Sequence, residues 1–147
     1  MPPRTLLVAA RAFDGQLSAH RVAAAVARGL ADGGWQADLC PIEGNERAAR
    51  AASDVRDLLG ALDFDARMRA ARALIVCEAR LREDTLAGSV AFEIATRARQ
   101  GGVPAYAVTA ENRLDSFDAR ILDLQAIVEA SSARSLRTAA RKLAALV

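Results

Sequence analysis

The sequence predicts an α/β fold in which helices cover both faces of a parallel sheet. Short apolar runs, too short for helices, recur along the chain and are separated by apolar stripes at helical spacing. The central run, Leu74–Cys77, is continuously apolar, as expected of a strand buried on both faces of a parallel sheet. Two glycine pairs, Gly33-Gly34 and Gly101-Gly102, follow helical stripes and mark where those helices end.

Five strands are predicted, near residues 5–9, 35–40, 73–77, 104–108 and 125–129. Their alternation with helical segments implies parallel pairing through right-handed crossovers. Residues 35–40 alternate apolar and polar side chains, which is typical of an edge strand with one exposed face. We therefore expect a three-layer, doubly wound sheet in the flavodoxin-like order 2-1-3-4-5.

The helical segments are less sharply bounded than the strands. We expect helices at Ser18–Leu30, 63–72, Thr85–Ala98 and 117–124, and from Ser131 or Ser132 to the end of the chain. Ser18 is a suitable N-cap residue for the first of them. A charged loop, Glu78–Asp84, is expected between the third strand and the helix that Thr85 opens.

Composition limits the possible classes of protein. A chain of 147 residues with 52% hydrophobic and 26% charged residues suits one globular domain, which we expect to span residues 1–147. The net charge of +2 gives no reason to expect binding to nucleic acid or to an anionic membrane. The first apolar run, Leu6–Ala10, is too short for a signal peptide, so we expect a cytoplasmic protein.

No common metal or cofactor motif is present in the sequence. Cys40 and Cys77 each end a predicted strand, have no CxxC spacing and are expected to be buried thiols, so no metal site is expected. The glycine pairs follow helices instead of preceding them, and there is no GxGxxG or Walker pattern. His20 lies in the first turn of a helix, without a partner motif for nucleophilic catalysis, and is expected to be structural.

The best place for a ligand is the carboxyl edge of the sheet, where strands 1 and 3 form a topological switch point. The segments after these two strands carry the candidate ligand-binding residues Arg11, Asp14, Glu78, Arg80 and Arg82. Two arrangements remain open. Either Arg11 pairs with Glu78 and Asp14 with Arg82, which would close the cleft, or the arginines converge on an open pocket for a carboxylate or phosphate.

Two segments resemble the bacterial glycerate kinase family. Residues 8–19 read VAARAFDGQLSA, where the family typically has VAPDSFKGSLSA. Residues 78–88, EARLREDTLAG, resemble the family's segment GEGRLDxQ[ST]LxGK. Residues 41–46 are a weaker match to its PLADGGEGT segment. The resemblance implies a Rossmann-like first domain whose inserted second domain is reduced to about residues 43–72.

The two segments keep structural residues of the family and lose charged ones. In the first, the family's Asp, Ser, Lys and second Ser are replaced by Arg11, Ala12, Asp14 and Gln16. In the second, its Asp and closing Lys are replaced by Arg82 and Ser89. Two charges are therefore reversed, at positions 14 and 82, and the sequence's one lysine, Lys142, lies far along the chain. Phosphoryl transfer depends on cations at the phosphates and on carboxylates for magnesium or the attacking hydroxyl.

The sequence therefore suggests a glycerate-kinase-like domain that has lost catalysis and binds a small anion or a protein. No catalytic residue is assigned and no cofactor is expected. The alternative is an active kinase of glycerate or a similar hydroxy acid, with ATP and Mg²⁺ as cofactors. In that case Arg11, Glu78 and Arg82 would take over the missing roles.

Overall fold

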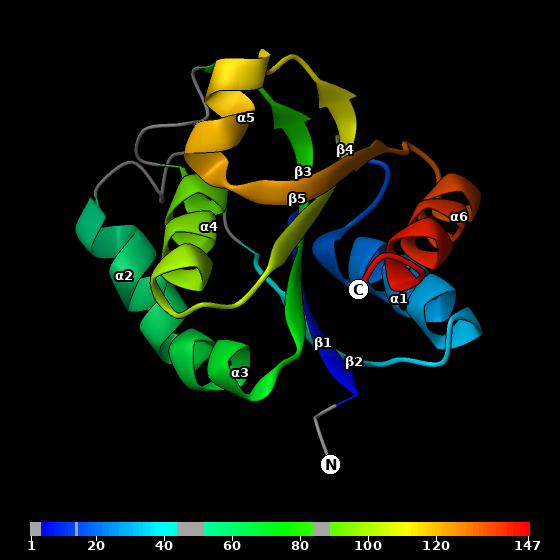
Figure 1. The fold of residues 1–147 in the computed structure, drawn as a ribbon, viewed down its shortest axis with the longest axis horizontal. Coiled ribbons are helices and arrows are strands. Elements are labelled where there is room, and N and C mark those ends of the chain that lie inside the picture. Colours follow the sequence, from blue (N-terminus) through cyan, green and yellow to red (C-terminus); the bar gives the residue numbers. More distant parts are fainter. Residues whose placement is uncertain (1–3, 14, 44–51, 84–88) are drawn as a thin grey trace.

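The computed structural model describes residues 4–13, 15–43, 52–83 and 89–147, with the side chains of 52–54 excepted. Five parallel strands form one sheet in the order β2-β1-β3-β4-β5 (Figure 1). They are β1 (Thr5–Ala10), β2 (Gln36–Pro41), β3 (Ala73–Leu81), β4 (Ala105–Asn112) and β5 (Leu124–Glu129). This confirms the predicted fold class and strand order.

Six helices connect or follow these strands in the described part of the chain. They are α1 (Ala19–Asp32), α2 (Ala52–Ala61), α3 (Phe64–Ala70), α4 (Val90–Gln100), α5 (Ser116–Leu122) and α6 (Ala133–Ala144). The predicted caps Ser18 and Ser132 both accept a hydrogen bond from the backbone three residues on, which starts α1 and α6. Helix α3 lies within the helix predicted at 63–72, whereas no helix was predicted where α2 lies.

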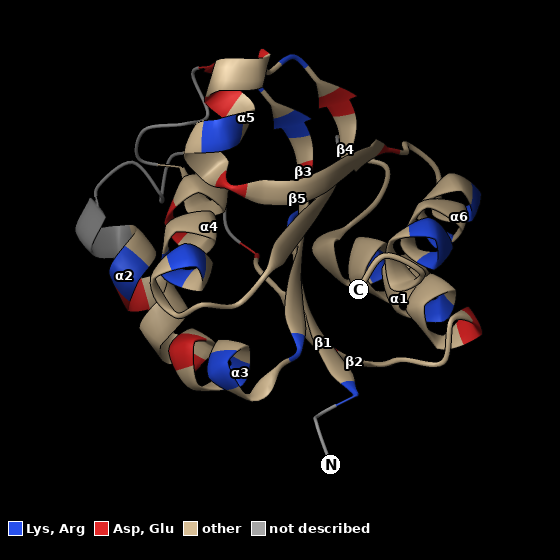
Figure 2. Ribbon diagram, viewed as in Figure 1, with Lys and Arg blue, Asp and Glu red and all other residues tan. Residues whose placement is uncertain are grey.

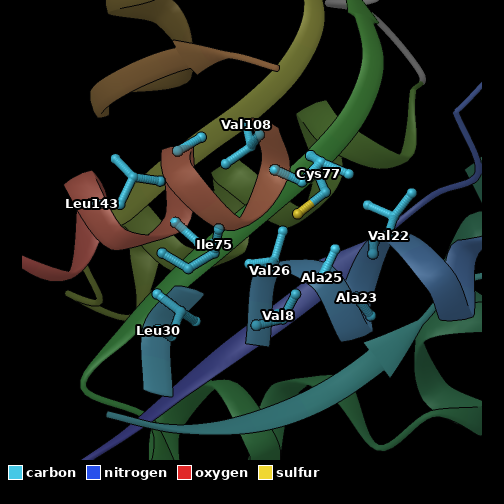
Figure 3. Packing of buried hydrophobic residues seen from close by; sticks show 14 of the residues in the cluster. Val8, Val22, Ala23, Ala25, Val26, Leu30, Ile75, Cys77, Val108 and Leu143 are labelled. Carbon is cyan, nitrogen blue, oxygen red and sulfur yellow. The ribbon is translucent and has the colours of Figure 1, made fainter. Parts of the chain in front are cut away.

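Each face of the sheet has its own hydrophobic core. On one face, α1 and α6 pack on side chains such as Val8, Ile75 and Val108, as Figure 3 shows. On the other, α2, α3 and α4 cover alternating neighbours such as Leu7 and Leu74. The core positions in β1 and β3 are almost continuously apolar because both faces of these strands are buried.

The predicted ends of the third and fourth strands were wrong. β3 and β4 run to Leu81 and Asn112, so part of the expected Glu78–Asp84 loop is strand. The reason is that Ala79 and Leu81 remain buried while this part of β3 stays paired with β4. Helix α4 begins at Val90 with Ser89 as N-cap, and Thr85, the predicted start, lies outside the described residues.

The helix predicted at 117–124 is also shorter at its end than expected. Asp123 adopts a left-handed conformation that ends α5, and Leu124 already belongs to β5. Leu124 therefore contributes to the sheet and not to the helix.

Candidate functional site

β3 and β4 extend past their neighbours at the carboxyl edge of the sheet. On the β1 side, the last backbone hydrogen bond to β3 among the described residues runs from the Arg11 N–H to the Cys77 carbonyl, at 2.9 Å. On the β5 side, the Ala130 N–H donates to the Thr109 carbonyl, also at 2.9 Å. Beyond these points, residues 78–81 and 109–112 form a two-stranded extension. It holds the charged side chains of the candidate site on regular strands.

A buried threonine braces the start of this extension. Thr109 is fully buried, and its Oγ1 lies 3.3 Å from the carbonyl oxygen of Ala79 and 3.2 Å from that of Glu111. The hydroxyl thus has acceptors on both strands of the extension. Hydrogen bonds of this kind, together with the strand pairing, fix the directions of the side chains that follow.

The centre of the site is Glu111, which three arginines surround. The β3–β4 register places Arg80 directly opposite Glu111, and Arg80 Nε lies 3.5 Å from Glu111 Oε2. Arg82 Nη2 lies 3.7 Å from the same oxygen, and Arg113 Nε donates to Oε1 at 2.5 Å. We call these four residues the arginine cluster.

The cluster favours the charged form of the carboxylate. The hydrogen bond from Arg113, together with the positive charges of Arg113, Arg82 and Arg80, lowers the pKa of Glu111. Glu111 is therefore ionised at neutral pH and supplies a negative charge among the three guanidinium groups. Guanidinium groups are suited to carboxylates and phosphates, which they can bind through two parallel hydrogen bonds.

An open pocket lies against this cluster. It has a volume of about 780 Å³, and the described residues lining it are Arg82, Glu83, Glu111 and Arg113. The pocket is large enough for a small organic anion. Its position at the carboxyl ends of β3 and β4 is where an open α/β sheet is expected to bind ligands.

The five predicted site residues can be located as follows. Arg80 and Arg82 meet at Glu111, whereas Asp14 lies outside the described residues. Arg11 follows the end of β1, and continuing the β1–β3 register places its backbone beside Glu78. The predicted Arg11–Glu78 and Asp14–Arg82 ion pairs stay predictions.

Sequence reasoning missed Glu111 and Arg113. Both lie after residue 108, where strand 4 was predicted to end, and were therefore assigned to a loop. A signal for the longer strands exists in residues 79–82, where Ala79 and Leu81 alternate with two arginines. Which residue of β4 lies opposite Arg80 depends on the register between the two strands, and no local sequence pattern indicates that register.

Other reactive groups give no second catalytic candidate among the described residues. Cys40 and Cys77 are buried thiols, as predicted, and burial raises the pKa of both. His20 lies 3.4 Å from Glu43, and both side chains are largely exposed. The described residues contain no group of three histidine, cysteine or acidic side chains arranged to hold a metal ion. Among the described helices, none combines the length and hydropathy that a membrane crossing requires.

The fold and the site define an α/β protein of flavodoxin-like strand order with a polar pocket at the carboxyl edge of its sheet. Comparison with known families then assigns the chain. It belongs to the glycerate kinase family, whose model matches residues 45–147. The matched region contains β3, β4 and the whole arginine cluster. Of the two resembling segments, residues 78–88 lie inside it and residues 8–19 precede it.

Solved structures share the fold at low sequence identity. A Burkholderia pseudomallei protein described as pilus assembly-related is 22% identical, with a TM-score of 0.52, and the match covers 96% of this chain and 89% of that one. An oxidoreductase from Corynebacterium diphtheriae is 14% identical, with a TM-score of 0.50 and coverage of 100% and 98%. A search of curated proteins found no match. Identities this low support the architecture and nothing about activity.

Proposed function

We propose that this chain is a catalytically degenerate glycerate-kinase-like domain that binds a small carboxylate or phosphate at its arginine cluster. In this proposal it acts as a cytoplasmic binding module, and residues 43–72 are what remains of the family's inserted second domain. The observation that carries the proposal is the position of Arg82. Arg82 occupies the position at which the similar family segment has an aspartate. Its guanidinium group lies near the Glu111 carboxylate, which the other two arginines of the cluster also contact, beside an open pocket.

The charge of the site argues against metal-assisted phosphoryl transfer. A magnesium ion in such sites is held by carboxylates and by the phosphates of the substrate. Here three guanidinium groups lie within 3.7 Å of the Glu111 carboxylate, so this carboxylate is already paired with cations and is poorly placed to hold a divalent metal ion. An anionic ligand would instead be attracted, and would compete with Glu111 for the same donors.

The first test is turnover of ATP with magnesium and D-glycerate, followed as release of ADP. We expect none above background, because the charges that position a phosphoryl group are reversed at residues 14 and 82. Turnover of about 1–10³ s⁻¹ that disappears in Glu78→Gln would establish the alternative, an active kinase of glycerate or a similar hydroxy acid.

The second test measures anion binding by calorimetry, with inorganic phosphate and D-glycerate as probes. Glu111→Gln removes the internal competitor and should raise affinity by about two- to fivefold, because each partly exposed ion pair contributes about 0.2–1 kcal/mol. The double variant Arg82→Gln, Arg113→Gln should lose binding. Arg21→Gln, which removes one positive charge from an exposed position of α1, is the control and should bind like the parent. Equal weak binding by all variants would show a nonspecific charge effect and reject the proposed site.

A further inference from the structure

The two edge strands of the sheet differ in how other parts of the chain cover them. At the β2 edge, Arg67 of α3 reaches across the strand, donating to the carbonyl of Leu39 and forming two hydrogen bonds with the Asp38 carboxylate. This contact covers an edge carbonyl and blocks the approach of another strand. β5, at the opposite edge, pairs with β4 and with no other strand among the described residues (Figure 1).

The outward-facing backbone groups of β5 can be assigned from its pairing with β4. Ala130 N–H donates to Thr109, so Ala130 and, two residues earlier, Val128 direct their backbone groups toward β4. In a parallel ladder the intervening residues face the other way. The N–H and C=O groups of Ile127 and Glu129 therefore face away from β4. β5 also contains no proline or lysine, residues that commonly protect an exposed edge.

A groove runs beside this edge. It has a volume of about 370 Å³ and is lined by the end of β5 and one side of α6, namely by Val128, Glu129, Ser132, Arg134, Ser135, Thr138, Ala139 and Lys142. The residues from α6 recur every three or four positions, so they form one continuous wall along the helix. The groove therefore places side-chain contacts next to backbone groups that can accept a further strand.

The wall of the groove is basic. Helix α6 contains four basic residues and no acidic one, and Figure 2 marks basic positions along this helix in blue. Arg137 and Arg141 bind Asp32 of α1. Arg134 and Lys142 instead line the groove, where Glu129 is the acidic residue among the lining positions. Acidic side chains would complement this wall.

We propose that β5 and α6 form a docking site for an extended, acidic segment of another protein. The segment adds to the sheet as a sixth strand, pairing its backbone with Ile127 and Glu129. Its acidic side chains lie along α6 near Arg134 and Lys142. Backbone pairing supplies affinity in this mode of recognition, and the groove selects side chains.

A second copy of this chain is a poorer occupant of the same edge. Pairing two β5 strands would bring together two α6 helices, each with Arg134 and Lys142 lining its groove. Like charges placed together at an interface oppose association. The acidic segment has the complementary charge and is therefore the occupant that the surface favours.

The experiment is a titration of ¹⁵N-labelled full chain with an acetylated and amidated hexapeptide of alternating threonine and glutamate. We expect amide shift changes in residues 125–129 and 134–142. A matched peptide with lysine in place of glutamate should bind at least about fivefold more weakly. The acidic peptide with a central proline should lose binding, because proline removes a backbone donor.

Variants of the protein distinguish recognition of the acidic peptide by the groove from a general effect of the protein's net charge. Lys142→Glu should weaken the acidic peptide by about fivefold or more. Arg21→Glu makes the same change of charge at an exposed position of α1 and should leave binding unchanged. Shift changes centred on residues 78–82 and 109–113, or equal binding of the acidic and basic peptides, would overturn the proposal. A concentration-dependent dimer with shifts at β5 in the absence of peptide would assign the edge to a second copy instead.

Discussion

Asp32 shows how one carboxylate joins two elements that are distant in sequence. It lies at the carboxyl end of α1, where the helix dipole disfavours a negative charge. Two hydrogen bonds from Arg137, at 2.8 and 2.9 Å, and one from Arg141, at 3.1 Å, compensate for this position. The hydrogen bond from Arg137 is the largest cause that lowers the pKa of Asp32 from 3.8 to about 2.

This lowered pKa predicts a pH-dependent contribution to stability. Because the folded-state pKa lies below the unfolded value, the contribution is fully present above about pH 4 and is lost as pH falls toward about 2. Asp32→Asn should therefore reduce the free energy of unfolding at about pH 5 and make a smaller difference near about pH 2. Urea unfolding at a series of pH values measures this. A difference between the proteins that stays constant with pH would contradict it.

At the level of single residues, part of the candidate site could be predicted from the sequence and part could not. Arg80 and Arg82 were predicted from their place after the third strand, at the topological switch point, and the structure places both at Glu111. Glu111 itself could not be predicted, since its role depends on lying opposite Arg80 across the β3–β4 pair. Ser18 and Ser132 were predictable because an N-cap bond is local, spanning three residues.

Among the helices, the closest packing is between α1 and α6, and glycines permit it. A Cβ on Gly29 would overlap the backbone carbonyl of Arg137 and lie 2.6 Å from the Cβ of Ala140. One on Gly33 would lie 2.5 Å from the Cβ of Ala144. The two helices approach through these small residues and cover one face of the sheet together.

We predict that Gly29→Ala destabilises the protein by about 1–3 kcal/mol, the usual cost of overpacking a close contact. Urea unfolding would measure the change. Gly60→Ala in α2 is a matched control, since a Cβ there meets no atom of the described residues within 4 Å outside its own stretch of helix. That control should stabilise the protein by up to about 1 kcal/mol through its helix propensity. Equal changes in stability at both positions would show that helix propensity, and not packing against α6, determines the effect of the substitution.

Predictions for whole elements succeeded where the pattern is long and failed at boundaries set by tertiary contacts. The helix predicted at Ser18–Leu30 contains Val22, Val26 and Leu30 at helical spacing, and all three are buried. The end of β3 was misplaced because charged residues in an extended strand look locally like a loop. Its pairing with β4, from a distant part of the sequence, keeps residues 78–81 in the sheet.

Across the whole molecule, one sheet lies between two hydrophobic cores, and its central strands contribute side chains to both. β1 and β3 send alternate side chains to opposite faces, so neither core can lose its helices without exposing the strands that support the other. This shared sheet was predictable, since the continuous apolar runs in these strands indicate burial on both faces. The protein should accordingly unfold as one cooperative unit.

A single tryptophan allows this cooperativity to be tested. Trp35 packs against the core beneath α1 and α6, and its Nε1 donates to the Ala144 carbonyl at 3.1 Å. Leu59 of α2 is fully buried in the opposite core. Leu59→Ala should destabilise the protein by about 2–5 kcal/mol, although it lies on the other side of the sheet from the fluorescent probe. In urea, Trp35 fluorescence and far-ultraviolet circular dichroism should shift to the same lower midpoint. If the fluorescence midpoint stayed at its parental value while the dichroism midpoint fell, the two faces would unfold separately and the shared sheet would not couple them.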